Sequence, residues 1–183
     1  MKTLIKYTLI FMMVLPLTAK VNGTLTVAKS DSQITIFGTS SLHDWEEDVK
    51  DFTVQGTWKD NLISGLELKI KTASIESGKS IMDDKTHEAL KADKHPWITF
   101  SADELTIEGS EVSGDGQLII AGKSHPIKVK SIIKEKGADY LIVKGNEEIN
   151  MKNYGIEPPT AMFGSLLTGE LVTISYEFKL ILK

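Results

Sequence analysis

The chain has 183 residues, of which 41% are hydrophobic and 25% are charged, and its formal net charge is −4. It contains neither cysteine nor arginine, so disulfides and cysteine metal sites are excluded, and the side chain that most often recognises phosphates and guanine edges is missing. We therefore expect one acidic domain stabilised by its own hydrophobic core, and no nucleic-acid partner.

Residues 1–19 are a predicted signal peptide. Lys2 and Lys6 precede an almost uncharged apolar run that ends in the small-residue pattern Leu17-Thr18-Ala19, which is typical of a cleavage site. The alternative is a retained membrane anchor, but the apolar run is shorter than the roughly 20 residues that a bilayer-spanning helix requires. The prediction is an exported, periplasmic protein whose mature chain, residues 20–183, is not stably inserted in the membrane.

From Leu25 onward, apolar and polar residues alternate in short runs, as they do in half-buried β-strands. Residues 52–58 and 66–70 are two such runs, and the polar stretch of residues 59–61 between them predicts a hairpin turn. In the second run, Leu66, Leu68 and Ile70 share one face, and charged residues occupy the other. This apolar face predicts the interior of the domain.

Residues 80–92 interrupt the strand pattern with helical periodicity, because apolar residues recur there at spacings of three and four. Ser80 is the predicted N-cap. Pro96 disfavours helix at His95, and a new alternating run starts at Ile98. We expect this short polar helix to lie across one end or side of the β-structure as a lid or plug.

Further alternating runs follow to the C-terminus, without a linker that would divide the domain. They cover residues 112–120, 127–133, 141–145 and 172–182. About eight strands of this kind, each with one apolar face, fit either a closed barrel or a sandwich of two sheets. The pattern alone does not decide between these two architectures.

Five stretches of the chain, in this order, resemble the YceI-like family. They are residues 38–45 (GTSSLHDW), 82–100 (MDDKTHEALKADKHPWITF), 116–127 (GQLIIAGKSHPI), 149–160 (INMKNYGIEPPT) and 170–182. The resemblance covers nearly the whole mature chain. It implies an all-β fold with one short helix, a lipocalin-like antiparallel β-barrel of about eight strands, that binds long isoprenoid lipids without a catalytic residue.

On this basis, the lipid tail is expected in a tunnel inside the barrel and the head group near the mouth. The predicted tunnel residues are Phe37, Phe52, Val54, Trp58, Leu66, Leu68, Ile70, Phe100 and Leu118. The predicted mouth residues are His43, Trp45, Trp97 and Tyr154. For the His43-Asp44-Trp45 turn, a structural corner and a ligand contact both remain open, since an amphipathic aromatic residue suits either.

Other chemistry is weakly supported by the sequence. The four histidines, at positions 43, 87, 95 and 125, lack metal-ligand spacing, so no metal site is predicted. No serine lies in a Gly-x-Ser-x-Gly elbow, and the adjacent Asp83 and Asp84 point about 100° apart on a helix. The expected protein is not an enzyme, and it needs no cofactor beyond a bound isoprenoid lipid or quinone as its ligand.

We therefore expect a protein that sequesters or carries an isoprenoid or other amphiphilic lipid. One alternative is a small metal protein or enzyme that uses the histidines. Another is a β-module with a filled core that acts through its surface, because inward-facing apolar residues suit an open tunnel and a packed core equally well. The identity of the lipid and the formation of a homodimer are left open.

Overall fold

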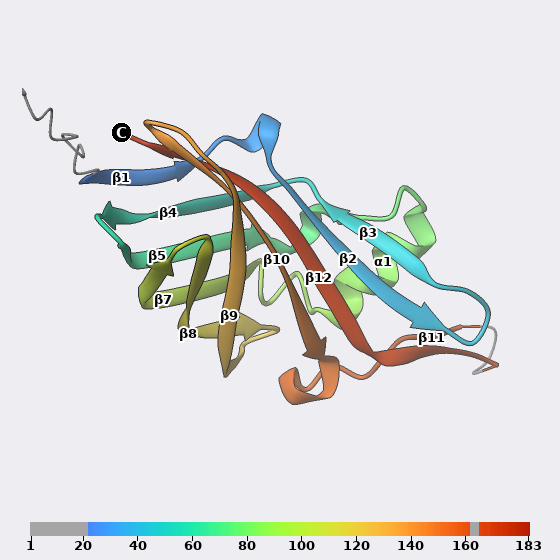
Figure 1. The fold of residues 1–183 in the computed structure, drawn as a ribbon. Coiled ribbons are helices and arrows are strands. Elements are labelled where there is room, and N and C mark those ends of the chain that lie inside the picture. Colours follow the sequence, from blue (N-terminus) through green and yellow to red (C-terminus); the bar gives the residue numbers. More distant parts are fainter. Residues whose placement is uncertain (1–21, 162–164) are drawn as a thin grey trace, which may run out of the picture.

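The structure is a computed structural model, and it describes residues 22–161 and 165–183 (Figure 1). The predicted signal peptide lies outside the described residues. Eight antiparallel strands close into a barrel, and one α-helix, α1 (Ser80–Ala89), lies at one end of it. The predicted fold, all-β with one short helix and a barrel of about eight strands, is confirmed.

The barrel is closed because its first strand pairs with both the second strand of the wall and the last one. In order around the wall the strands are β1 (Asn22–Val27), β4 (Phe52–Lys59), β5 (Leu62–Lys71), β7 (Trp97–Glu108), β8 (Glu111–Ile120), β9 (Lys123–Lys136), β10 (Tyr140–Asn150) and β12 (Leu166–Leu182). Closure leaves no free sheet edge around this ring except where a ladder is interrupted.

One side of the barrel is taller than the other, because β12 is 17 residues long and β1 pairs only with its C-terminal end. The earlier part of β12 pairs with β2 (Gln33–Ser40), which pairs in turn with β3 (Trp45–Val49). The remaining short elements are β6 (Ile75–Glu76), β11 (Thr160–Ala161) and the 3₁₀ turns η1 (Lys29–Asp31), η2 (Thr72–Ser74) and η3 (Met151–Tyr154). The extended wall and α1 together surround the mouth of the barrel (Figure 1).

The pairing register places apolar residues side by side on the inner face. Val54 pairs with Leu68, Leu68 with Phe100, and Phe100 with Leu118, so four neighbouring strands contribute one continuous inward row. The predicted turn between the first two of these strands is also present, since Lys59 pairs with Leu62 across it. At the end opposite α1, the fully buried Trp58 helps to close the barrel.

The helix differs from its prediction at both ends. Ser80 is its first residue and does not cap it; the carboxylate of Asp83 instead accepts hydrogen bonds from the backbone nitrogen of Ser77, at 2.7 Å, and from its hydroxyl, at 2.6 Å. The helix ends at Ala89 and not at Ala92, because Lys91 adopts a left-handed conformation with a φ of 55°. The predicted N-cap is therefore wrong.

Candidate ligand-binding cavity

Two cavities follow one another inside the barrel. The larger, of about 570 Å³, lies at the mouth beneath α1, and the smaller, of about 110 Å³, lies deeper. Four side chains line both, namely Ile34, Ile70, Ile98 and Ile174, so the two cavities are neighbours along one interior space. The larger cavity alone falls within the roughly 300–1,000 Å³ that is typical of small-molecule sites.

Several side chains that face the interior of the barrel are not fully covered by other side chains. Leu66, Leu68 and Tyr176 are half-buried and line the smaller cavity, whereas Val54 beside them is buried. In a close-packed core such side chains would be buried by their neighbours across the barrel. The interior is therefore hollow, and it is not the filled core that the sequence left open.

Six of the predicted tunnel residues line these cavities: Val54, Leu66, Leu68, Ile70, Phe100 and Leu118. Phe52 and Trp58 point inward and are buried, but neither lines a cavity. The ring of Phe52 lies 5.7 Å from that of Phe178, and the Trp58 Nε1 donates a hydrogen bond of 2.8 Å to the carbonyl oxygen of Asp60. Phe52 therefore packs within the barrel wall, and Trp58 packs at the closed end of the barrel.

Phe37 is a predicted tunnel residue, but the structure shows that this prediction is wrong. Its side chain is 41% exposed and lines neither cavity. Side chains alternate along β2, and Ile34 and Ile36 occupy the inward face, so Phe37 points outward. The residues of β2 that line the larger cavity are Ile34, Ile36 and Ser40.

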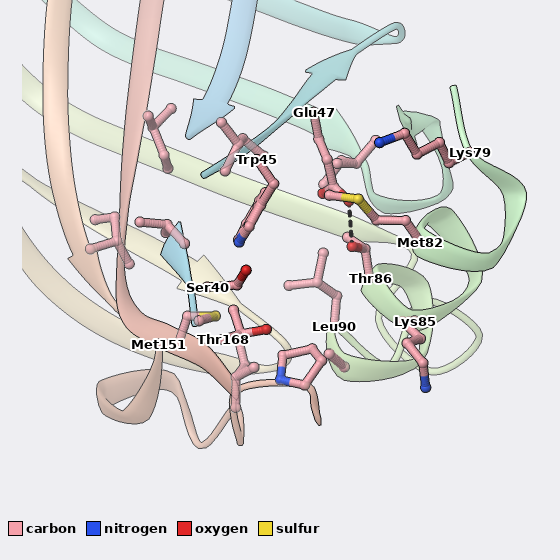
Figure 2. Close-up of a pocket in the computed structure, with 18 of the residues that line it drawn as sticks. Ser40, Trp45, Glu47, Lys79, Met82, Lys85, Thr86, Leu90, Met151 and Thr168 are labelled. Atoms are coloured by element: carbon pink, nitrogen blue, oxygen red, sulfur yellow. Dashed lines mark hydrogen bonds between the residues drawn. The ribbon is translucent and has the colours of Figure 1, made fainter. Parts of the chain in front are cut away.

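Two of the four predicted mouth residues, His43 and Trp45, line the larger cavity. The Trp45 Nε1 donates to the carbonyl oxygen of Thr39 at 3.1 Å, and the His43 Nδ1 donates to the carbonyl oxygen of Asp44 at 2.8 Å. These bonds hold the turn in shape, while the indole ring faces the cavity (Figure 2). The turn is thus a structural corner that also forms part of the cavity wall.

The other two predicted mouth residues lie away from the cavities. Trp97 is 49% exposed at the start of β7, where it pairs with Lys71. Tyr154 is buried in η3 and packs edge-on against the ring of His125, with 5.1 Å between the ring centroids. Both predictions rest on the position of the residue in a loop or at a strand end, and that position does not determine which way a side chain points.

Glu47 is a cavity residue that the sequence analysis missed. It lies on the inward face of β3 between Trp45 and Val49, and only 2% of it is exposed. Its Oε1 accepts a hydrogen bond of 2.6 Å from the Thr86 hydroxyl of α1 (Figure 2). Burial raises the pKa of Glu47 above its usual value, and the bond from Thr86 acts against this shift. The alternation Trp45, Glu47, Val49 was the signal that could have placed it inside.

The helix closes the larger cavity from above, as expected of a lid. Its cavity-lining residues are Ser80, Ile81, Met82, Lys85, Thr86 and Ala89. In Figure 2, the amine of Lys85 points away from Glu47 and Thr86, whereas the thioether of Met82 lies beside them. Apart from the polar pair Glu47–Thr86, this face of the helix presents mostly apolar atoms to the cavity.

A second polar group lines the smaller cavity, and it too was missed. The Tyr176 hydroxyl lies 2.8 Å from the Ser131 hydroxyl, and Glu147 lines the same chamber. Burial raises the pKa of Tyr176 to about 12. Burial also raises the pKa of Glu147, and a hydrogen bond from the Lys130 backbone amide acts in the opposite direction. Uncharged forms of both side chains are thereby favoured.

The histidines do not converge. Nε2 of His87 donates to the carbonyl oxygen of Ile75 at 2.9 Å, and His125 packs against Tyr154. Within residues 22–161 and 165–183, no group of three or more histidine, aspartate or glutamate side chains is placed to hold a metal ion.

In the part of the chain that the structure describes, no helix has the length and hydropathy needed to cross a membrane.

The family model of the YceI-like domain matches residues 11–180. The chain belongs to the YceI-like family. The family that the five sequence stretches indicate is therefore confirmed. A comparison with curated proteins gave no match.

Several solved structures share the fold. BcnA of Burkholderia cenocepacia superposes with a TM-score of 0.73 at 18% identity, covering 84% of this chain and 98% of BcnA. A polyisoprenoid-binding domain from Saccharophagus degradans, implicated in plant cell wall breakdown, gives 0.70 at 12% identity over 87% and 98%. The YceI protein of Campylobacter jejuni gives 0.58 at 19% identity over 73% and 82%. At these identities, the similarity establishes the YceI-like barrel fold.

Proposed function

We propose that this protein binds a long isoprenoid or similar amphiphilic lipid inside the barrel, and that it sequesters or carries this lipid without catalysing a reaction. The observation that carries the proposal is the interior itself, a cavity of about 570 Å³ that continues into a second cavity. Most of the surface that lines the two cavities is apolar, and the polar side chains are a minority. Membership of the YceI-like family, and the polyisoprenoid-binding domain among its structural neighbours, support the same class of ligand.

Burial of the tail supplies the binding energy in this proposal. Each methylene group that leaves water contributes about 0.8 kcal/mol, so an isoprene unit of about five carbons contributes roughly 3–4 kcal/mol before entropic costs. A few units in a preformed apolar cavity are sufficient for firm binding. Catalytic groups and a metal cofactor have no part in this mechanism.

We also propose that the protein acts in the periplasm. The support is the sequence of residues 1–19, which has the charged start, apolar run and small-residue end of a signal peptide. In that compartment, a closed lipid cavity would shield an isoprenoid tail from water between membranes. The proposed ligand is an isoprenoid lipid or a quinone.

Native mass spectrometry of the protein purified from its own host, followed by organic extraction, tests the proposal. The expected result is a bound polyprenyl species that leaves on extraction. A preparation that carries a stoichiometric metal and no lipid would contradict the proposal and support the histidine-based alternative. The same measurement reports whether the chain is a monomer or a homodimer.

A further inference from the structure

The deeper cavity contains three polar side chains in an otherwise apolar chamber. Ser131, Glu147 and Tyr176 come from the neighbouring strands β9, β10 and β12 and meet at one place in the wall. The other lining residues are all isoleucine, leucine, valine or phenylalanine. A simple container for hydrocarbon does not require this group, because polar side chains in an apolar chamber cost free energy.

Part of the arrangement has a structural explanation. The ladder between β9 and β10 ends at the pair Ser131 and Gly145, and beyond it the Lys130 amide donates to the Glu147 side chain. Tyr176 pairs with Gly145 from the other side, and a Cβ atom on that glycine would overlap the tyrosine hydroxyl group. The tyrosine side chain therefore crosses β10 to reach Ser131 on β9.

The hydroxyl groups still have hydrogen-bonding capacity after this contact. Tyr176 and Ser131 carry one hydroxyl proton each, and the 2.8 Å contact between them uses only one of the two. The second proton and the remaining lone pairs are available at the cavity wall. An oxygen atom of a ligand in this chamber would find a donor there.

The charges of the chamber discriminate between kinds of head group. Among the described residues, no lysine or histidine lines the smaller cavity, whereas His43, Lys79 and Lys85 line the larger one. A phosphate in the deep chamber would lose its hydration without gaining a counter-ion and would lie near the carboxyl group of Glu147. An uncharged oxygen-bearing group meets no such penalty.

We propose that the deep chamber binds the uncharged, oxygen-bearing end of the amphiphile, such as the hydroxyl of a prenyl alcohol or the carbonyl of a prenylquinone, through Tyr176, Ser131 and Glu147. This inference rests on the proposed function. The isoprenoid tail then extends into the larger cavity beneath α1, in agreement with the relative volumes of the two spaces. The ligand therefore enters with its polar end first, which reverses the orientation expected from the sequence, with the head group near the mouth. Phosphorylated prenyl lipids are poor ligands for the deep chamber.

Three probes with the same tail test this arrangement: farnesol, farnesyl phosphate and the hydrocarbon farnesene. We expect the purified chain, stripped of lipid, to bind farnesol more tightly than farnesene. The variant Tyr176→Phe keeps the ring and removes the hydroxyl group, so it should weaken farnesol binding about five- to tenfold and change farnesene binding less than twofold. Ser131→Ala is a second variant with the same expectation, should Tyr176→Phe fail to fold.

The matched control is Tyr140→Phe, which removes a hydroxyl group from a tyrosine of β10 that lines neither cavity. We expect this variant to leave farnesol binding unchanged. An equal loss of farnesol and farnesene in both hydroxyl variants, or an equal loss of farnesol and farnesyl phosphate in Tyr176→Phe, would overturn the assignment of the uncharged polar end to the deep chamber. A wild-type chain that binds neither farnesol nor farnesene would instead contradict the proposed lipid-binding function itself.

Discussion

The Thr86 hydroxyl of α1 donates a hydrogen bond to the carboxyl group of Glu47 on β3, with 2.6 Å between the two oxygen atoms. This contact joins the lid helix to the barrel wall at the edge of the cavity (Figure 2). Because Glu47 is buried, loss of the donor would leave a desolvated carboxyl group without this partner. The position of the helix over the mouth thus depends on a polar contact as well as on apolar packing.

The variant Thr86→Val should therefore loosen the lid. It keeps the side-chain shape and removes the donor, and we expect a destabilisation of about 1–3 kcal/mol. Hydrogen exchange should accelerate most in residues 80–90. Thr86→Ser retains the hydroxyl group and is the matched control. Equal exchange in the valine variant and the wild type would show that the bond does not hold the helix.

The buried carboxyl group should also produce a measurable pH dependence. Burial raises the pKa of Glu47 in the folded state above its usual value of 4.5, so the folded protein holds this proton more firmly than the unfolded chain does. The contribution of Glu47 to stability is therefore fully present below the unfolded pKa and is lost as the pH rises through the folded pKa. The stability of wild type relative to Glu47→Gln should fall as the pH rises above about 4.5, the usual glutamate value, as measured by denaturant unfolding.

Asp83 supplies a control of opposite sign. Its hydrogen bonds from Ser77 lower the pKa of this carboxyl group, so its contribution is present above the unfolded pKa and is lost as the pH falls through the folded pKa. The stability of wild type relative to Asp83→Asn should consequently rise with pH as the pH approaches 3.8, the usual value for this carboxyl group, from below. Parallel pH profiles for the two variants would contradict the assigned direction for Glu47.

The hollow interior predicts an unusual tolerance of a large side chain. Leu68 lines the deeper cavity, so Leu68→Trp should block lipid binding with little loss of stability. The same substitution at Leu141, which is fully buried and lines neither cavity, should cost about 1–3 kcal/mol through overpacking. Thermal melts and lipid extraction from the same preparations compare the two. Similar destabilisation at both positions would mean that the cavity does not persist in solution.

Processing of the N-terminus is a further expectation. The mature protein should begin near Lys20, because the predicted cleavage pattern ends at Ala19. N-terminal sequencing of protein from the periplasmic fraction checks this. Recovery of intact Met1 in the membrane fraction would favour the anchor that the short apolar run argues against.

The sequence alone predicted the features that depend on local alternation. The strands around Leu66, Leu68 and Ile70, their hairpin turn and the single helix follow from periodicity, because side chains alternate along a strand and recur at every third or fourth residue in a helix. Phe37 is a predicted tunnel residue that does not obey this signal, because alternation from Ile34 and Ile36 places it on the outward face of β2.

Only the tertiary structure decided whether the interior is open. Alternation states which face of a strand is apolar, but a void depends on the distance between opposite walls, which strand number and tilt set together. The same limit applies to Ser131, Glu147 and Tyr176, which come from three strands and meet only when the sheet curves into a barrel. The sequence determined what faces inward, and closure of the barrel decided how much room remains there and which polar groups share it.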